Sequence, residues 1–259
     1  MNLRLTHIST ATLLIEIGSL RLLTDPVFDP AGGRYFFGYG TDSIKLTEPS
    51  IRPQDLGKID ATLLSHDHHD DNLDRAGRVL LPLAKKVITT SAGARRLKNN
   101  AIGLKTWQST TIKADGIEIK ITATPAHHGT LGSHLIVGET TGFILEWAGQ
   151  KHGALYISGD TVWFNGLHEV AQRFKIGTAI LHIGAARFPI MGPIRFTLNA
   201  KEALQIAHAF NPHAVIPIHY EGWKHFKETG ADAGKVFEAS DIKEKIHWLT
   251  LGKSEEIES

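Results

Sequence analysis

The most constraining feature of this sequence is a short apolar segment that runs directly into a cluster of imidazole and carboxylate side chains. The segment is "LLSHDHHDDNLD", residues 63–74, and it places three histidines and three aspartates between His66 and Asp71. Residues 61–65 predict a short buried strand that stops at this cluster. Neutral imidazoles and carboxylates together form a nitrogen and oxygen site that suits Zn, Mn or Fe. An ordinary solvated loop is the alternative, and it accounts less well for this order of residues.

The spacing of the first two histidines favours a shared binding role. His66 and His68 are two residues apart, so in an extended loop both imidazoles would leave the same side of the chain. Asp67 and Asp74 are expected to support neighbouring groups or to cap a helix rather than to bind an ion directly.

Three later strands are also predicted to end in histidine or aspartate. "ITATPAHHG" carries His127 and His128 after a β run. "ALYISGDT" ends a strand with Asp160, and "AVIPIHYEGW" ends one with His219. Ligands in layered α/β folds gather beyond the ends of strands, so the four segments are expected to converge on one site.

The hydrophobic pattern predicts strands through most of the chain and helices mainly in the second half. Runs of β-favouring residues are separated by turn residues, and Asp115-Gly116 is a strong hairpin signal. The predicted strands cover residues 3–9, 10–18, 20–28, 61–65, 110–114, 117–125, 143–149, 154–160, 178–184, 214–220 and 245–251. Alternation of strands and helices indicates a layered α/β architecture.

Two segments have helical spacing. Residues 73–81 are expected to begin after Asn72 as the N-cap, and residues 199–210 after a capping box of Asn199 and Glu202. No linker, repeat or low-complexity segment is visible. We therefore expect residues 1–259 to form a single domain of two mixed sheets packed face to face, with helices outside.

Composition narrows the kinds of binding partner and the cellular location that we expect for the chain. The formal net charge is +1, so there is no broad basic field for nucleic acid. Cysteine is absent, which excludes disulfides and thiolate metal sites and fits a cytoplasmic location. No run approaches the roughly 20 apolar residues of a membrane span.

At these motifs the chain resembles the metallo-β-lactamase-fold hydrolases nearly end to end. The resemblance rests on "THISTATLLIEIGSLRLLTDPVF", "SHDHHDDNLD", "TPAHHG", "YISGDTVWF" and "IPIHYEGW". It looks closest to the branch that contains ascorbate-6-phosphate lactonase and N-acyl-phosphatidylethanolamine phospholipase D. The resemblance implies a four-layered αβ/βα sandwich with a dinuclear metal site at the edge of the sheets. It is not specific for the substrate, because this superfamily supports very different reactions.

The family motif is H-x-H-x-D-H, and this sequence departs from it. Without a gap, Asp70 matches the motif's aspartate and Asp71 stands where the last histidine belongs. With one inserted residue, Asp71 and the following Leu73-Asp74 match, and Asn72 replaces that histidine. We favour the second register because it aligns more residues. His69 is adjacent and stays open as the missing ligand.

The resemblance implies two groups of metal ligands. One ion would be bound by His66, His68, His128 and Asp160. The other would be bound by Asp71, Asp160 and His219, one nitrogen fewer than usual. The second ion is therefore expected to bind more weakly, or to be a harder ion such as Mn²⁺. The expected cofactors are two divalent metal ions, with Zn first and Mn or Fe as alternatives.

The resemblance also implies a metal-dependent hydrolase of a small ester, lactone or phosphodiester. Metal coordination lowers the pKa of water from 15.7 to about 7. Asp71, with Asp70 as the fallback, would orient the resulting nucleophile and take up a proton. An iron-dependent redox enzyme and a catalytically degenerate metal-binding protein are the alternatives. The expected partner is a small-molecule substrate, with no nucleic acid and no membrane span, and a homo-oligomer is left open.

Other residues near the predicted site have no settled role. His182 ends a predicted strand and is left open, while His7 and Asp25 either support the metal ligands or fix turns. Residues 29–40 carry four aromatic side chains, which either pack over the sheet or form a wall for an apolar substrate. Arg187 or Arg195 would suit an anionic group, and an ordinary surface position is the alternative for both. Surface or structural roles are expected for His134, His152, His168, His208, His213 and His247.

Overall fold

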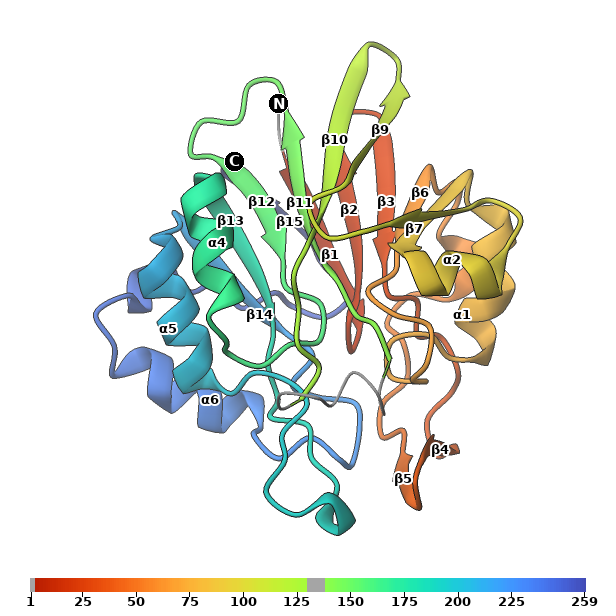
Figure 1. Cartoon of the computed structure of the whole chain (residues 1–259), viewed down its shortest axis with the longest axis vertical. Coiled ribbons are helices and arrows are strands. Elements are labelled where there is room, and N and C mark those ends of the chain that lie inside the picture. The colour runs from red at the N-terminus through yellow and green to blue at the C-terminus, as the bar shows by residue number, and fades with distance from the viewer. Residues whose placement is uncertain (1–2, 130–137) are drawn as a thin grey trace.

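A computed structural model describes residues 3–129 and 138–259 and contains two β-sheets packed face to face (Figure 1). His134 lies outside the described residues. The strands are β1 (Leu3–Ser9), β2 (Thr12–Ile17), β3 (Leu20–Thr24), β4 (Arg34–Gly38), β5 (Thr41–Ile44), β6 (Ala61–Leu63), β7 (Lys86–Thr90), β8 (Ala101–Leu104), β9 (Ser109–Ala114), β10 (Ile117–Thr124), β11 (Gly142–Trp147), β12 (Ala154–Ile157), β13 (Ile176–His182), β14 (Ala214–Ile218) and β15 (Ser254–Ile257). The α-helices are α1 (Arg75–Leu80), α2 (Ser91–Leu97), α4 (Gly166–Arg173), α5 (Ala200–Phe210) and α6 (Gly230–Glu238).

Both large sheets are mixed, as the sequence predicts. The first has the strand order β15-β1-β2-β3-β6-β7-β8, with antiparallel pairs as far as β3 and parallel pairs beyond it. The second has the order β14-β13-β12-β11-β10-β9, in which β12, β13 and β14 are parallel. Strands β4 and β5 form a separate hairpin.

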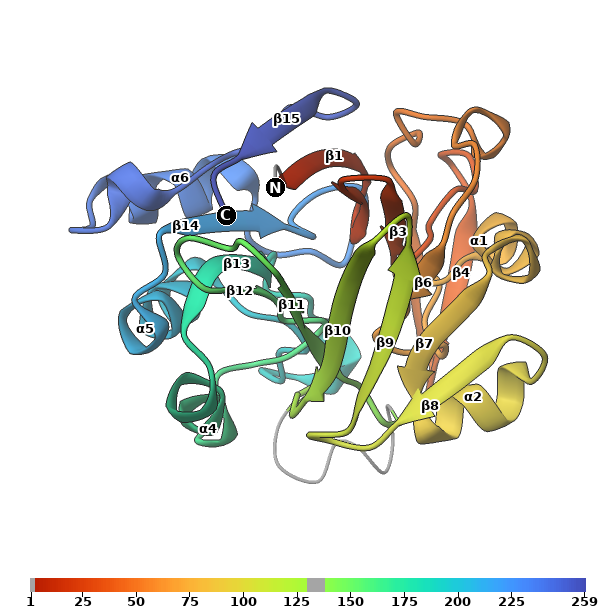
Figure 2. The ribbon, with the colours of Figure 1, turned by 90° about the horizontal axis from the view of Figure 1, so that it is seen from above.

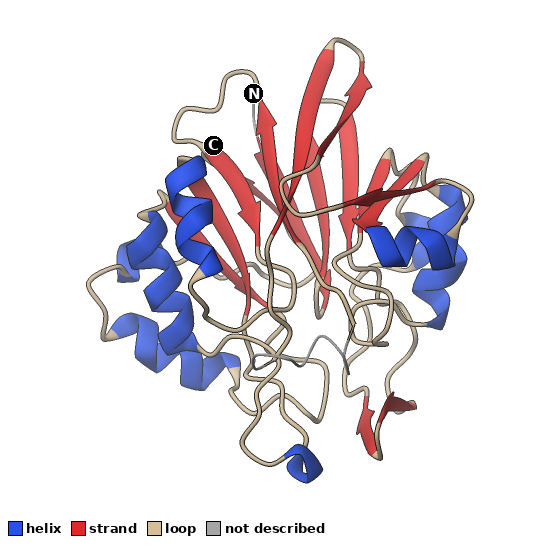
Figure 3. Cartoon of the chain, viewed as in Figure 1, coloured by secondary structure: helices blue, strands red, loops and turns tan. Residues whose placement is uncertain are grey.

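The apolar residues of the strands are divided between an inner and an outer layer. Leu13 and Ile15 of β2 contribute to the core between the two sheets, whereas Leu14 packs on the outer side, because successive side chains of a strand point to opposite faces. Helices α1 and α2 lie outside the first sheet, and α4, α5 and α6 lie outside the second (Figures 2 and 3). This is the predicted four-layered αβ/βα sandwich.

Two predictions that depend on residues close together in the sequence are confirmed. Asn199 Oδ1 accepts a hydrogen bond from the Glu202 amide at 2.8 Å, and the Asn199 amide donates to Glu202 Oε2 at 3.2 Å, which completes the predicted capping box of α5. The β9–β10 hairpin turns at Asp115 and Gly116, whose φ angles are +49° and +78°. Two consecutive positive φ angles are the reason that this dipeptide favours a tight hairpin.

Two predicted elements are wrong. Residues 245–251 form no strand, and Ile246 makes only an isolated bridge with Val215, while the last strand is β15. Asn72 does not cap α1; Asp74 does, because its Oδ1 accepts a hydrogen bond from the Gly77 amide at 2.8 Å. The capping side chain therefore lies two residues later than predicted.

Strand direction brings several chain segments to one edge. Because β10 and β12 are both antiparallel to β11, and β13 and β14 are parallel to β12, the carboxyl ends of all four strands meet at the same edge of the second sheet. The loop after β6 reaches this edge from the first sheet, where the Thr141 amide donates to the Ser65 carbonyl at 3.1 Å. Across residues 3–129 and 138–259, every helix is too short or too polar to span a bilayer.

Candidate metal centre

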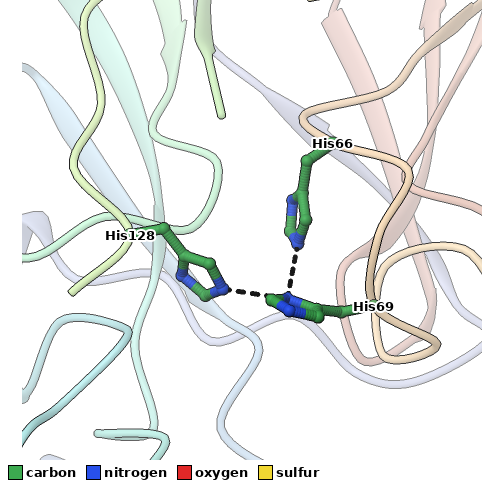
Figure 4. A group of neighbouring side chains, drawn as sticks. All are labelled: His66, His69 and His128. Carbon is green, nitrogen blue, oxygen red and sulfur yellow. Dashed lines mark hydrogen bonds between the residues drawn. The ribbon is translucent and has the colours of Figure 1, made fainter. Parts of the chain in front are cut away.

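Three imidazoles converge where the loops after β6 and β10 meet (Figure 4). Nε2 of His66 lies 3.1 Å from Nδ1 of His69, and Nε2 of His128 lies 3.0 Å from the same atom. The three residues offer ligand nitrogens within 4.8 Å of one another. We name this set the triad, and three imidazole nitrogens around one point are a common arrangement for a divalent transition metal.

For His66 and His128, the hydrogen bond that Nδ1 makes determines that Nε2 carries the lone pair. Nδ1 of His128 lies 2.8 Å from the Phe196 carbonyl oxygen, which can only accept, so Nδ1 is protonated and Nε2 carries the lone pair. The Ser65 hydroxyl donates to Asp25 Oδ1 at 2.8 Å, so it accepts from Nδ1 of His66 at 2.9 Å. Both rings therefore present Nε2 lone pairs inward, as metal-binding histidines do.

Burial keeps two imidazoles of the triad, those of His66 and His69, neutral. Burial holds the pKa of the His66 imidazole well below its usual value, and the neighbouring His128 adds to the shift. Burial and the same neighbour lower the pKa of His69 to about 3. Neutral imidazoles are the form that binds metal ions, so His66 and His69 are ready for a cation at neutral pH.

His68 does not join the triad. Its Nε2 accepts a hydrogen bond from Arg96 Nη2 at 2.8 Å, and Arg96 also pairs with Asp67 through two nitrogen–oxygen contacts. The loop is not extended, since the Leu73 amide donates to the His69 carbonyl at 2.9 Å in a helix-like turn. The two-residue alternation of His66 and His68 therefore does not hold, and His69 faces His66 instead.

A second group lies at the ends of β13, β14 and β12. His182, His219 and Asp160 offer ligand atoms within 4.8 Å of one another, and all three are fully buried. Nδ1 of His182 lies 2.9 Å from Asp160 Oδ1, and Nε2 of His219 lies 3.6 Å from the same oxygen. Burial opposes ionisation of Asp160, but His219 and His182 outweigh it and hold the pKa of the carboxyl well below its usual value.

Asp71 lies beside this second group and is held by a histidine that the sequence did not single out. Its Oδ2 is 3.7 Å from Nε2 of His219 and 3.0 Å from Nε2 of His225. Burial opposes ionisation of Asp71, but the hydrogen bond from His225 lowers its pKa. Among the described residues, Asp71 Oδ1 and His182 Nε2 are buried without a hydrogen-bond partner. Such atoms are costly, and a bound cation would satisfy them.

Asn72 connects the two groups. It is fully buried, and in either orientation of its amide the Nδ2 atom donates to a carboxylate oxygen of Asp160, at 3.3 Å or 3.2 Å. It also contacts the Ser65 hydroxyl at 3.2 Å. The residue that the family motif would have as histidine is thus an amide in contact with the carboxylate of the second group.

The remaining predicted residues lie around these groups. Asp70 is only half-buried and makes no hydrogen bond within the described ranges, and burial together with the Asp71 charge raises its pKa to about 6. Asp25 supports the triad through Ser65, whereas His7 contacts the Thr10 carbonyl at 3.0 Å. Of the two adjacent carboxylates, Asp71 is the one that reaches the second group.

A narrow apolar pocket of about 30 Å³ opens beside the triad. Its walls combine aromatic side chains of the β4–β5 hairpin and of the segment after β13, including Phe37, Tyr39, Phe188 and Phe196. His69, Asp71, His128 and His225 face the same space. Of the two alternatives for the aromatic residues of 29–40, a wall position thus holds for Phe37 and Tyr39, whereas Tyr35 packs against Trp223.

No arginine or lysine lines this pocket within the described residues. Arg195 is committed elsewhere, because its guanidinium makes two contacts with Glu202 at 3.0 Å and 2.8 Å. The anion-binding role that the sequence suggested for Arg195 at this pocket is therefore not supported.

Sequence reasoning did not assign His69, His182 or His225 as site residues. His69 lies next to the predicted ligand His68, and His182 lies near the end of a predicted strand. For both residues the sequence leaves the role as a ligand open. His225 follows β14 by seven residues in a segment without periodicity, so no signal in the sequence relates it to Asp71.

Comparison with known proteins indicates the family of the chain. A beta-lactamase superfamily domain matches residues 20–220. The UPF0173 metal-dependent hydrolase of Pyrococcus furiosus is 26% identical over 255 residues, which cover 98% of this chain and 99% of that protein. The UPF0173 protein YddR of Bacillus subtilis is 24% identical over 238 residues, which cover 86% of this chain and 88% of that protein.

Solved structures share the fold. The isothiocyanate hydrolase from Delia radicum gut bacteria has a TM-score of 0.82 at 22% identity, with 98% of this chain and 99% of that chain covered. CmlA, a diiron β-hydroxylase from Streptomyces venezuelae, has a TM-score of 0.67 at 16% identity, with 100% of this chain and 54% of that chain covered. At such identities the likeness concerns the fold, because one fold supports many chemistries.

Proposed function

The chain belongs to the beta-lactamase superfamily, and from this premise we propose that it is a metal-dependent hydrolase of small, largely apolar carbonyl substrates. The observation that carries the proposal is the convergence of three imidazoles, two of which, those of His69 and His128, line an aromatic pocket. The relatives named metal-dependent hydrolases support the reaction class.

Two cations fit the donor atoms. His66, His69 and His128 would bind the first, and His182, His219 and Asp160 would bind the second. This differs from the ligand set expected from sequence in three ways: His69 takes the role of His68, His182 takes the role of Asp71, and Asp160 binds the second ion only. Imidazole and carboxylate donors without thiolates suit Zn, Mn or Fe, and Zn is the first choice for the triad.

A bound cation would lower the pKa of a coordinated water and polarise the substrate carbonyl. The residues of the chain have separate tasks in this scheme. Asp71 faces the pocket and is held by His225, so its carboxylate can orient a water molecule and accept its proton. Phe37 and Phe188 exclude bulk water and contact the apolar part of the substrate.

The pocket favours a neutral substrate over an anionic one. Its walls are aromatic and its described lining contains no Lys or Arg, so only the bound cations would offset the charge of a phosphodiester. Carboxylic esters and lactones carry a neutral electrophilic carbon, and an isothiocyanate has one as well. We therefore rank esters and lactones first, isothiocyanates next and phosphodiesters last.

The test is a substrate panel with metal reconstitution. Protein freed of metal by chelation is assayed with para-nitrophenyl esters, an aryl lactone, benzyl isothiocyanate and bis-para-nitrophenyl phosphate, each with added Zn²⁺, Mn²⁺ or Fe²⁺. We expect metal-dependent hydrolysis of at least one neutral substrate, lost in His66→Ala and Asp160→Ala. His208→Ala, an exposed histidine paired with Asp241, is the matched control and stays active. Unchanged turnover in either site variant would remove the proposal.

Iron-dependent redox chemistry is the second candidate. Its support is the nitrogen and oxygen donor set, which also suits iron, together with the fold shared with a diiron β-hydroxylase. Iron retained through purification, with oxygen uptake and no hydrolysis across the panel, would favour this candidate over the first. Metal binding without either activity would indicate a binding protein.

A further inference from the structure

Two histidines and a glutamate meet on the side of the molecule where the chain's described residues end. His152 lies in the loop between β11 and β12, His213 in the loop between α5 and β14, and Glu258 directly after β15. Figures 1 and 2 show that this end of the chain lies beside the β11–β12 loop, and the Lys151 amide donates to the Ser259 carbonyl there at 2.8 Å.

The two imidazoles are aligned with the carboxylate. Their rings stack with centroids 3.7 Å apart and an interplanar angle of 5°. Nε2 of His152 lies 3.5 Å from Glu258 Oε1, and Nε2 of His213 lies 3.8 Å from Oε2. Each imidazole therefore directs its outer nitrogen at a different oxygen of one carboxylate.

These contacts are too long to be good hydrogen bonds, which have donor–acceptor distances near 2.9 Å. Nε2 of His152 is buried and has no hydrogen-bond partner among the described residues, although part of the ring is exposed. The cluster thus holds a buried nitrogen to which the described residues offer no hydrogen bond, and its ligand atoms lie within 4.8 Å of one another.

We propose that His152, His213 and Glu258 form a separate surface site for one divalent transition-metal ion such as Zn²⁺ or Ni²⁺. Two imidazoles and a carboxylate favour these borderline ions over Mg²⁺ or Ca²⁺, which prefer oxygen ligands. Ligand distances of about 2.0–2.2 Å need only small rotations of side chains that are 30–55% exposed. The proposal is independent of the proposed hydrolase function.

The site would join the two sheets. Glu258 continues from β15 of the first sheet, whereas His152 and His213 lie beside strands of the second. An ion that binds only this folded arrangement stabilises it in proportion to the logarithm of its free concentration. Metal binding would therefore tie the end of β15 to the second sheet.

Lys151 competes with the ion. Its Nζ lies 3.1 Å from Glu258 Oε1, and its side chain is 71% exposed. An exposed ion pair of this kind is weak, so a divalent ion can displace it. Removing the ammonium group should strengthen metal binding, while removing a ligand should abolish it.

The experiment compares Zn²⁺ stoichiometry and thermal unfolding in the full chain. Wild type, His213→Ala, Glu258→Gln and His208→Ala are dialysed against Zn²⁺ at neutral pH. We expect the first two variants to bind one ion fewer per chain than wild type and His208→Ala, and to lose part of the Zn²⁺-induced rise in Tm. Activity on any substrate is unchanged, because His213 and Glu258 neither belong to the triad nor line its pocket.

Lys151→Ala supplies the second test, because it alters no ligand. We expect Lys151→Ala to retain the full number of ions. We expect it to bind the ion of this surface site several-fold more tightly than wild type, as measured by competition with a coloured chelator. Equal stoichiometry in wild type, His213→Ala and Glu258→Gln would overturn the proposal. Weaker binding by Lys151→Ala would overturn it as well.

Discussion

Nε2 of His225 lies 3.0 Å from Oδ2 of Asp71, and this contact joins the segment after β14 to the histidine-rich loop after β6. The opposite ring atom, Nδ1, lies 2.8 Å from the hydroxyl of Ser43 at the end of the β4–β5 hairpin. Burial lowers the pKa of His225, so at neutral pH the neutral ring donates to Asp71 and accepts from Ser43. Three separate segments thus position one carboxylate.

Replacing this histidine should impair catalysis more than substrate binding. We expect His225→Ala to lower kcat by about 10–100-fold, because partners of this kind are worth that much in metal sites, with a smaller change in KM. His225→Gln keeps a hydrogen-bond donor and should recover part of the rate. Steady-state kinetics on the best substrate of the panel would check both, and a purely structural role would give equal losses in the two variants.

The adjacent histidines His68 and His69 should differ sharply in metal binding. His69 belongs to the triad, whereas His68 is paired with Arg96. We expect His69→Ala to lose one tightly bound ion per chain and His68→Ala to retain it. Elemental analysis after dialysis measures this directly. The opposite result would restore the ligand set expected from the sequence alone.

The metal-free protein should lose stability in mild acid. Burial lowers the pKa of His69 to about 3 and that of His7 to about 4, while both titrate near 6.5 in an unfolded chain. Between these values the unfolded state binds more protons, so the free energy of unfolding falls as pH drops from about 6.5 towards 4. At higher pH the contribution is fully present.

Urea unfolding of the metal-free protein between about pH 7.5 and about pH 4.5, a range set by these titrations, would measure the loss of stability. We expect the free energy of unfolding to fall by about 1.4 kcal/mol for each unit of pKa difference that lies within this pH range. His69→Gln should show a shallower pH dependence than wild type, since one of the buried titrating groups is removed. A pH dependence identical to that of wild type would contradict the burial argument.

The aromatic wall should determine preference for apolar substrates. Phe37 packs against Phe188 with ring centroids 5.2 Å apart and lines the pocket beside His69. We expect Phe37→Ala to lower kcat/KM for an aryl ester about tenfold while changing that of an acetate ester much less. Kinetics on esters of increasing apolar size would show this, and Phe36→Ala, which alters an exposed ring of the same hairpin, is the control.

A buried ion pair next to the histidine-rich loop after β6 should contribute to stability. Lys45 and Asp74 are fully buried, with Nζ and Oδ2 3.3 Å apart. Lys45→Met leaves a buried carboxylate without its counter-charge and should lower the free energy of unfolding by about 3–5 kcal/mol. Arg34→Ala breaks an exposed pair with Asp42 and should cost less than about 1 kcal/mol. Equal losses in urea unfolding would argue against a special role for burial.

Much of the architecture could be predicted because its signals are local. The hairpin at Asp115-Gly116 and the capping box of Asn199 depend on residues within three positions of one another, and both are confirmed. Residues 245–251 had a strand-like pattern but found no partner strand, since only Ile246 bridges to Val215. A β-strand forms only when it pairs with a neighbouring strand, and the sequence does not show which strand is available for pairing.

The sequence by itself determined which strands end in histidine or aspartate, and their directions bring those ends to one edge. The tertiary structure alone decided which side chains meet there. A single turn after His69 places that ring, and not His68, opposite His66. His225 reaches Asp71 across 154 positions of sequence. Such contacts depend on backbone path and packing between distant segments, which no local spacing of residues encodes.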